Sequence, residues 1–176
     1  MMDQTKAGSG FPADEFEALV RTHQHALLQY AGRLINDPVR AQDVVQETFI
    51  RYLNTPPEAA DAEAKAAWLF RVAHNLSVDL VKTESRRGEL LKQVVPPDPV
   101  PPVSNVLAER EAWERLEGLL QHVSVDQRAV ILLFYQQGKS YREIAEITGM
   151  SMSNVGMTLH RGLKKLRPIL EEDGQV

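Results

Sequence analysis

The sequence predicts an all-α protein built from two small helical domains that a proline-rich linker joins. Three observations lead to this prediction. Apolar residues recur every three or four positions through both halves of the chain, which is the spacing of an amphipathic helix. Five prolines between Pro96 and Pro102 separate the two halves. Near the C-terminus a short helix, a glycine turn and a second helix follow one another, and 176 residues suffice for two compact modules.

The first domain, residues 12–85, is expected to hold three helices. The first covers about 16–35 and stops at Asn36-Asp37-Pro38, because proline disfavours helix in the residue before it. The second runs from about 39 to 54, and Thr55-Pro56-Pro57 ends it. The third is expected to end near Glu84. Its apolar stripe consists of Leu69, Val72, Ala73, Leu76 and Leu80.

Residues 86–104 are expected to form the linker. Their prolines favour an extended, semi-rigid chain, and 19 residues could separate their ends by about 60 Å. Helical spacing resumes at Leu107, Trp113 and Leu116, so the second domain is expected to cover residues 105–172.

The second domain contains a helix-turn-helix pattern. An apolar helix over about 126–135 leads into a turn that contains Gly138. Ser140 then precedes Glu143 by three residues, which is the capping-box signature of a helix start. Gly149 is typical of a helix end followed by a sharp turn, and Ser151 is expected to cap the final helix. Two helices joined in this way are typical of DNA-binding domains.

The outer face of that final helix has side chains suited to a major groove. Its buried side is expected to be Val155, Leu159, Leu163 and Leu166. Asparagine can pair with adenine, methyl groups can contact thymine, and basic residues can contact phosphates. The candidate DNA-binding residues are Ser151, Ser153, Asn154, Met157, Thr158, Arg161, Lys164 and Lys165. A solvated face of a structural helix is the alternative interpretation of this polarity.

Charge is unevenly distributed along the chain. The net charge is -4, yet residues 138–167 carry six basic and two acidic side chains. Because phosphate neutralisation drives binding to free duplex, an acidic protein with one basic end is expected to need a larger partner to hold it on DNA.

Other classes of protein find little support in the sequence. There is no cysteine, which excludes disulfides, thiolate-zinc sites and cysteine nucleophiles and suits a reducing cytosol. We expect no metal site and no cofactor, and His74 is expected to be a packed or solvated side chain. No glycine-rich phosphate loop or nucleophile elbow indicates an enzyme. Apolar runs are too short to cross a bilayer and the N-terminus does not resemble a secretory signal, so we expect a soluble, cytoplasmic protein.

Three fragments resemble one known family, the extracytoplasmic-function sigma factors of bacterial RNA polymerase. Residues 43–49, DVVQETF, resemble the part of sigma region 2 that docks on core polymerase. Residues 68–75, WLFRVAHN, resemble the part that meets the minus-ten promoter element. Residues 140–147, SYREIAEI, together with 159–167, LHRGLKKLR, resemble region 4, which reads the minus-thirty-five element.

The resemblance implies roles for individual residues. Polymerase docking would involve Asp43, Gln46 and Glu47, with Val45 and Phe49 turned inward. In the minus-ten site Asn75 would bind a base drawn out of the non-template strand, and Trp68 would brace the melted edge, although a core position for Trp68 is the equal alternative. The full minus-ten set is Lys65, Trp68, Arg71, Asn75, Lys82, Arg86 and Arg87.

The chain departs from the family pattern in two places. Residues 60–67 are mostly alanine and acid, where the family places aromatic and polar groups that grip the minus-ten base. Gly156, Met157 and Thr158 replace residues that commonly contact phosphate and guanine. Since a glycine within a helix costs about 1 kcal/mol relative to alanine, Gly156 suggests a close approach of the backbone to DNA or to a partner.

The function expected from these features is a sigma factor that binds core RNA polymerase and directs promoter recognition, DNA melting and initiation. The family also implies a regulatory anti-sigma partner. The alternative is a free-standing helix-turn-helix regulator, which would need a more basic surface and a dimer matched to paired half-sites.

Overall fold

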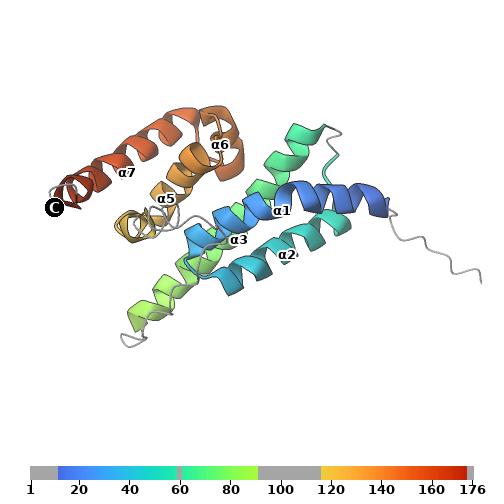
Figure 1. The fold of residues 1–176 in the computed structure, drawn as a ribbon, viewed down its shortest axis with the longest axis horizontal. Helices are drawn as coiled ribbons and strands as arrows, with labels where there is room; N and C mark the ends of the chain where they lie inside the picture. Colours follow the sequence, from blue (N-terminus) through green and yellow to red (C-terminus); the bar gives the residue numbers. More distant parts are fainter. Residues whose placement is uncertain (1–11, 59–60, 91–115, 174–176) are drawn as a thin grey trace, which may run out of the picture.

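The computed structural model describes residues 12–58, 61–90 and 116–173, and these form two packed helical modules (Figure 1). The N-terminal module consists of α1 (Ala13–Ile35), α2 (Pro38–Asn54) and α3 (Ala62–Leu90). The C-terminal module consists of a helical stretch at 116–120, α5 (Val125–Ile131), η1 (Leu132–Gln136), α6 (Tyr141–Thr148) and α7 (Met152–Asp173). The described residues contain no strand, which confirms the predicted all-α class.

Local sequence signals set the ends of the N-terminal helices. Asn36 adopts a left-handed conformation with φ of 60° and ends α1. The Asp37 carboxylate accepts hydrogen bonds from the backbone N–H groups of Val39 and Arg40 at 3.0 and 3.1 Å, and Pro38 occupies the first turn of α2. Proline is favoured there because its missing N–H would have had no partner inside the helix.

The core of the N-terminal module lies where its three long helices meet. Leu27, Tyr30, Leu34, Tyr52 and Leu69 are all fully buried. Phe16 meets Phe49 edge to face, with ring centres 6.1 Å apart. Such aromatic pairs stabilise a core beyond the area they bury.

The third helix is longer than the sequence analysis predicted. It continues through Leu90 rather than ending near Glu84, so residues 86–90 are helical and not part of an extended linker. Apolar spacing stops near Leu80, but residues 84–90 are rich in arginine and glutamate, which favour helix without needing burial. Glu84 also pairs with Arg40 of α2. The rest of the expected linker lies outside the described residues.

The helix expected over 126–135 also differs from the prediction. It ends as α5 at Ile131, and residues Leu132–Gln136 form a π-helical turn. The Gln137 N–H bonds to the Leu132 carbonyl at 3.1 Å and the Lys139 N–H to the Leu133 carbonyl at 2.9 Å. These wide turns insert backbone that apolar spacing does not reveal.

No helix among the described residues is long and apolar enough to cross a membrane.

Candidate nucleic-acid interface

The helix-turn-helix forms as its sequence signals predict. The hydroxyl of Ser140 accepts a hydrogen bond from the Glu143 N–H at 3.3 Å, and the Glu143 carboxylate accepts from the Ser140 N–H at 2.8 Å. The hydrogen bond from the Ser140 backbone N–H is the main cause that lowers the pKa of Glu143 to about 2. The Lys139 ammonium, 3.0 Å from the Glu143 carboxylate, lowers it as well. Gly149 ends α6 with φ of 74°. The first helix of the motif is therefore defined at both ends by local contacts.

The final helix of the motif presents a free outer face. The Ser151 hydroxyl accepts from the Asn154 N–H at 3.2 Å, so Ser151 caps α7 as predicted. Val155, Leu159 and Leu166 are buried, and Leu163 is partly buried. The predicted DNA-binding residues Ser153, Asn154, Met157, Arg161, Lys164 and Lys165 are exposed, whereas Thr158 is half-buried.

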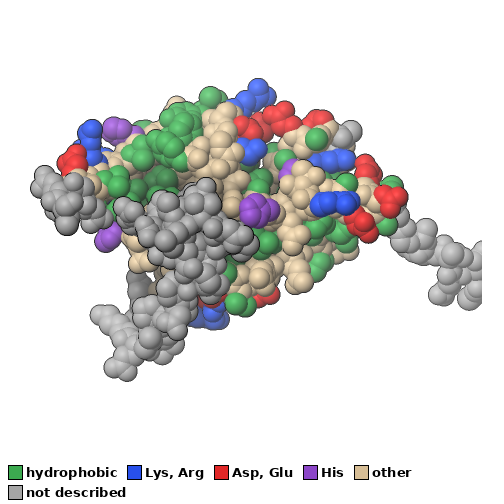
Figure 2. Space-filling model, viewed as in Figure 1, with side chains coloured by type: hydrophobic (Ala, Val, Ile, Leu, Met, Phe, Trp, Pro, Cys, Tyr) green, Lys and Arg blue, Asp and Glu red, His purple; other side chains and the backbone are tan. Residues whose placement is uncertain are grey.

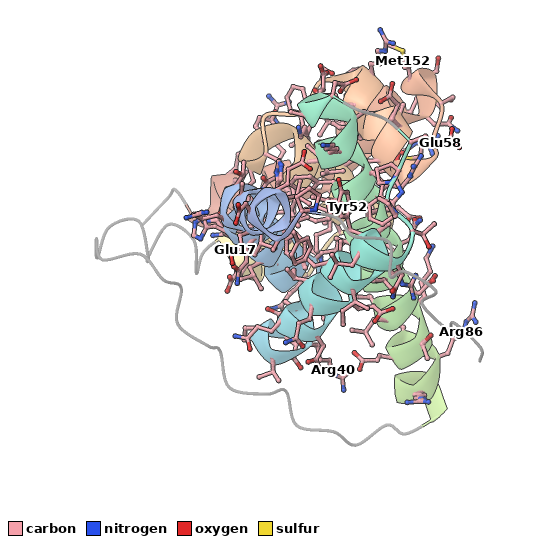
Figure 3. The ribbon with its side chains drawn as sticks, turned by 90° about the vertical axis from the view of Figure 1, so that its right-hand side faces the viewer. Glu17, Arg40, Tyr52, Glu58, Arg86 and Met152 are labelled. Atoms are coloured by element: carbon pink, nitrogen blue, oxygen red, sulfur yellow. The ribbon has the colours of Figure 1, made fainter. Side chains whose placement is uncertain are left out.

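One exposed residue of this helix was not among the predicted DNA-binding residues. Met152, the first residue of α7, is 55% exposed and lies at the tip of the C-terminal module (Figure 3). Its position in the first turn, directly before Ser153, was the available signal, because recognition helices contact base edges with their N-terminal residues.

The two glycines of α7 have different surroundings. A Cβ at Gly156 would lie 3.5 Å from the Tyr141 ring of α6, which is ordinary contact. Gly156 therefore faces α6 with room for a Cβ, and the expected approach of its backbone to DNA or to a partner stays a prediction. A Cβ at Gly162 would lie 2.9 Å from Ile131 Cδ1. At Gly162, α5 and α7 thus pack so closely that a Cβ would require the end of the Ile131 side chain to shift.

Five of the seven predicted minus-ten residues lie on the exposed side of α3. Arg71, Asn75, Lys82, Arg86 and Arg87 are all exposed. Arg86 is near the far end of α3, at the opposite end of the molecule from Met152 (Figure 3). The helix therefore brings together an elongated polar and basic surface.

The remaining two residues of that set are held within the N-terminal module. Lys65 is 21% exposed and its ammonium lies 3.7 Å from the Glu15 carboxylate of α1. Trp68 is half-buried and meets Tyr52 edge to face, with ring centres 5.5 Å apart. The structure therefore gives Trp68 the packing contact that the sequence left as an alternative to a DNA role.

The outward face of α2 combines acidic and apolar side chains. Asp43 and Gln46 are exposed and Glu47 is 45% exposed, while Val45 and Phe49 are buried, as predicted. Beside them lie three exposed apolar residues that the sequence analysis did not single out. These are Val39, Ile50 and Leu53, with exposures of 65%, 49% and 37%. Together with Asp43 and Gln46 they follow one another along α2 at steps of three or four residues. All five therefore lie along one side of the helix, as a stripe.

His74 is part of the core rather than of a binding site. It is 5% exposed, and its Nδ1 forms a 2.8 Å hydrogen bond with the Tyr30 hydroxyl. Burial lowers the pKa of His74 to about 4 and raises the pKa of Tyr30. Tyr30 therefore stays protonated and can donate to a neutral imidazole. Within the described ranges no three ligand side chains come close enough to hold a metal ion.

Apolar side chains also gather over α7 on the face shown in Figure 2. A groove of about 380 Å³ lies there between the 116–120 helix, η1 and α7. Leu116, Leu132 and Leu163 line it, and Tyr135 and Leu170 at its edge are 62% and 53% exposed. Exposed apolar grooves of this kind commonly receive another polypeptide.

Together, a helix-turn-helix module and a three-helix module with a basic helix surface define a two-part DNA-binding protein. Sequence comparison agrees. The model of Sigma-70 region 2 matches residues 19–87, and that of Sigma-70, region 4 matches residues 113–166. The chain is 37% identical over 159 residues to the RNA polymerase sigma-E factor of Streptomyces avermitilis, which covers 89% of this chain and 86% of that protein. It is 32% identical over 182 residues to the ECF RNA polymerase sigma factor SigL of Mycobacterium tuberculosis, covering 98% of both chains.

Solved structures resemble the fold as well. The structure of CnrH in complex with the cytosolic domain of CnrY aligns with a TM-score of 0.69 and 26% identity, over 94% of this chain and 93% of that one. The sigma factor RpoE in complex with the anti-sigma factor NepR, from Bartonella quintana, aligns with a TM-score of 0.68 and 21% identity, over 90% of this chain and 98% of that one. The chain belongs to the RNA polymerase sigma factors of the extracytoplasmic-function type.

This membership confirms the predicted family and disfavours the free-standing regulator. The roles of individual residues, and the division of the chain at 85 and 104, stay predictions.

Proposed function

We propose that the protein acts in the cytoplasm as an initiation factor without catalytic activity of its own. It binds core RNA polymerase, brings it to promoters that carry minus-ten and minus-thirty-five elements, and assists DNA melting. The observation that carries this proposal is the outer face of α7 from Ser153 to Lys165, which is exposed apart from half-buried Thr158 and contains no acidic residue.

The minus-thirty-five element is assigned to α7. Met152, Asn154 and Met157 lie in the first two turns, where a recognition helix contacts base edges. Asparagine is suited to adenine, and methionine offers an apolar contact for thymine methyl groups. Arg161, Lys164 and Lys165 follow further along α7, where basic side chains can contact the phosphates of the DNA backbone. This chemistry favours an element rich in A·T pairs.

The minus-ten element is assigned to the exposed side of α3. Arg71 and Asn75 lie one turn apart, and Arg86 and Arg87 extend the positive surface. Asn75 offers an amide donor and acceptor to an unpaired base, while the arginines offer charge to the displaced strand.

Polymerase binding is assigned to the stripe on α2. Apolar contact by Val39, Ile50 and Leu53 supplies burial, and Asp43 and Glu47 supply charge for a basic partner surface. Core polymerase would therefore supply the affinity for DNA that a chain of net charge -4 lacks.

An anti-sigma protein is the proposed regulator. One protein of similar structure, RpoE, has been solved in complex with the anti-sigma factor NepR, and another, CnrH, in complex with the cytosolic domain of CnrY. The α2 stripe and the apolar groove beside α7 are the surfaces that such a partner would compete for.

The test separates the two activities. Purified core RNA polymerase is mixed with the protein, binding is measured by pull-down, and run-off transcription is measured from the promoter of its own gene. We expect Asn154→Ala to lower specific transcription about tenfold, since one base contact contributes about 1–3 kcal/mol. Arg161→Ala should also lower transcription, because a phosphate contact is lost, and both variants should leave polymerase binding intact. Asp43→Ala combined with Glu47→Ala should weaken polymerase binding.

Glu171→Ala, at the far exposed end of α7, is the matched control and should change neither activity. Loss of both activities in every variant would contradict the assignment of surfaces. Failure of the wild-type protein to bind polymerase, combined with tight binding to duplex alone, would reject the proposed function.

A further inference from the structure

Three of the five methionines of the chain lie together in the helix-turn-helix, within residues 150–157. Met150 lies in the turn before α7, Met152 is the first residue of α7, and Met157 follows in its second turn. Because the chain contains no cysteine, the methionine thioether is the sulfur group that an oxidant meets in this protein. Most of that sulfur is gathered at the helix assigned to the minus-thirty-five element.

The three side chains differ in their exposure to solvent. Met152 is 55% exposed and Met157 is 48% exposed. Met150, by contrast, is half-buried and packs against the hydrophobic core. Since access to solvent governs how readily such a sulfur atom is oxidised, the motif contains two reactive methionines and one shielded methionine at neighbouring positions.

Met157 lies in the middle of the face of α7 that is assigned to DNA. Ser153 precedes it by four residues and Arg161 follows it by four, so these three side chains lie on one side of the helix. A flexible thioether at this position can adapt to the shape of a base edge and contact thymine methyl groups. The contribution of Met157 to base recognition therefore depends on an apolar side chain.

Hydrogen peroxide changes that property without adding a charge. A lone pair of the sulfur attacks one oxygen of the peroxide, and the S–O bond forms as the O–O bond breaks. The leaving hydroxide takes up the proton of the transferred hydroxyl group and departs as water. The sulfur is thereby oxidised by two electrons and the peroxide is reduced by two. The sulfoxide product is polar, and methionine sulfoxide reductases return it to the thioether.

A sulfoxide on this face opposes recognition of bases more than attraction to DNA. Against a thymine methyl group the sulfoxide oxygen would lose its water without gaining a hydrogen-bond donor, which is unfavourable. The basic side chains of Arg161, Lys164 and Lys165 are unchanged and can still contact phosphates. Oxidation therefore weakens the reading of sequence and leaves the non-specific contacts in place.

We propose that Met152 and Met157 form a reversible oxidation site, at which hydrogen peroxide lowers recognition of the minus-thirty-five element. This inference rests on the proposed function for its effect on transcription. The modification itself is measured on the protein alone, so the two can fail separately.

The first experiment measures the modification. The folded full chain is treated with hydrogen peroxide for increasing times, and the gain of one oxygen at each methionine is followed by tandem mass spectrometry of its peptides. We expect Met152 and Met157 to be oxidised at least about fivefold faster than Met150, because exposure controls the rate. Treatment in urea, where the chain is unfolded, should abolish this difference. Equal rates at the three positions of the folded protein would overturn the proposal.

The second experiment measures the consequence. The protein is treated with peroxide, the peroxide is removed, and core RNA polymerase and promoter DNA are then added for run-off transcription. We expect transcription to fall about fivefold, since a buried apolar contact is replaced by an unpaired polar one, and to recover after incubation with methionine sulfoxide reductases. Met157→Gln, which places a polar side chain of similar length there, should lower transcription without peroxide.

Leucine variants identify the sulfur atoms responsible. Met152→Leu combined with Met157→Leu keeps both side chains apolar but removes the oxidisable sulfur, so its transcription should be the same before and after treatment. Met150→Leu is the matched control and should remain as sensitive to peroxide as the wild type. An undiminished loss of activity in the double variant would overturn the proposal.

Promoter DNA provides an independent test of the contact. In the complex of core polymerase, protein and promoter, oxidation of Met157 should be slower than in the free protein, whereas the rate at Met150 should be the same. Oxidation of Met157 at an unchanged rate would reject the effect on recognition. An untreated wild type that neither binds polymerase nor supports transcription would instead reject the proposed function, and the oxidation sites would stand on the mass measurements.

Discussion

The two modules are stabilised in different ways. In the N-terminal module three long helices surround a core of large side chains, and one buried polar pair, Tyr30 with His74, lies within it. In the C-terminal module short helices are defined by capping boxes at Ser124 and Ser140 and by left-handed glycines at 138 and 149. The first depends on contacts between residues far apart in sequence, and the second depends more on local contacts.

This difference bears on function. The orientation of α7 follows from a turn only a few residues long, and its outer face is free. The basic residues of α3 lie along a helix that other elements cover in part, so Lys65 and Lys82 both meet carboxylates from elsewhere in the chain. A recognition surface next to a well-defined turn is thus easier to predict than one on a long packed helix.

The largest effect should come from acidifying the N-terminal core. The pKa of His74 is lowered from about 6.5 in the unfolded chain to about 4 in the folded one, so the unfolded state binds more protons between these values. The contribution of the neutral, buried imidazole to the free energy of unfolding is complete above pH 6.5. It is lost as the pH falls from 6.5 to 4, by up to about 3 kcal/mol. Urea unfolding at several pH values would measure it.

In His74→Gln the free energy of unfolding should change little between pH 6.5 and 5. His160→Gln, at an exposed position of α7, should retain the pH dependence of the wild type. Identical pH profiles for the wild type and His74→Gln would show that the buried imidazole does not control acid stability.

An intermediate effect should come from overfilling the contact between α5 and α7. Gly162→Leu forces a side chain against Ile131, where even a Cβ would lie at 2.9 Å, and should lower the free energy of unfolding by about 2 kcal/mol. In the N-terminal module Gly32→Ala is the control, because its Cβ would lie 3.9 Å from that of Ala41. Thermal unfolding followed by circular dichroism compares the two, and equal stability would contradict the close packing of α5 and α7.

The smallest effect should come from removing the local cap of the helix-turn-helix. Ser140→Ala should cost about 1 kcal/mol, because the Glu143 N–H loses its acceptor. It should also raise the pKa of Glu143, which a carbon-detected NMR titration would follow. Ser153→Ala, at an exposed position in α7, should leave stability within about 0.5 kcal/mol of wild type. A loss of stability in both Ser140→Ala and Ser153→Ala, or in neither, would show that the cap does not define α6.

Prediction from sequence succeeded where the signal is local. The capping box at Ser140, the left-handed Gly149 and the cap at Ser151 each involve residues within four positions of one another, and all three form as predicted. The inward stripe of α7 and the outward acidic residues of α2 follow from helical spacing in the same way. The end of α3 was placed too early because apolar spacing was followed and helix propensity was not.

By itself, the sequence determined that this protein is all-α, two-part and equipped with a helix-turn-helix, because helix periodicity and capping act over one or two turns. Only the tertiary structure decided that α5 and α6 pack on α3, that Arg128 caps α1, and that Asp126 meets Lys82. Arg128 and Leu34 are 94 residues apart in the chain, and Asp126 and Lys82 are 44 residues apart. Their meeting depends on how two complete modules pack against each other, and the spacing of residues along either module carries no information about that packing.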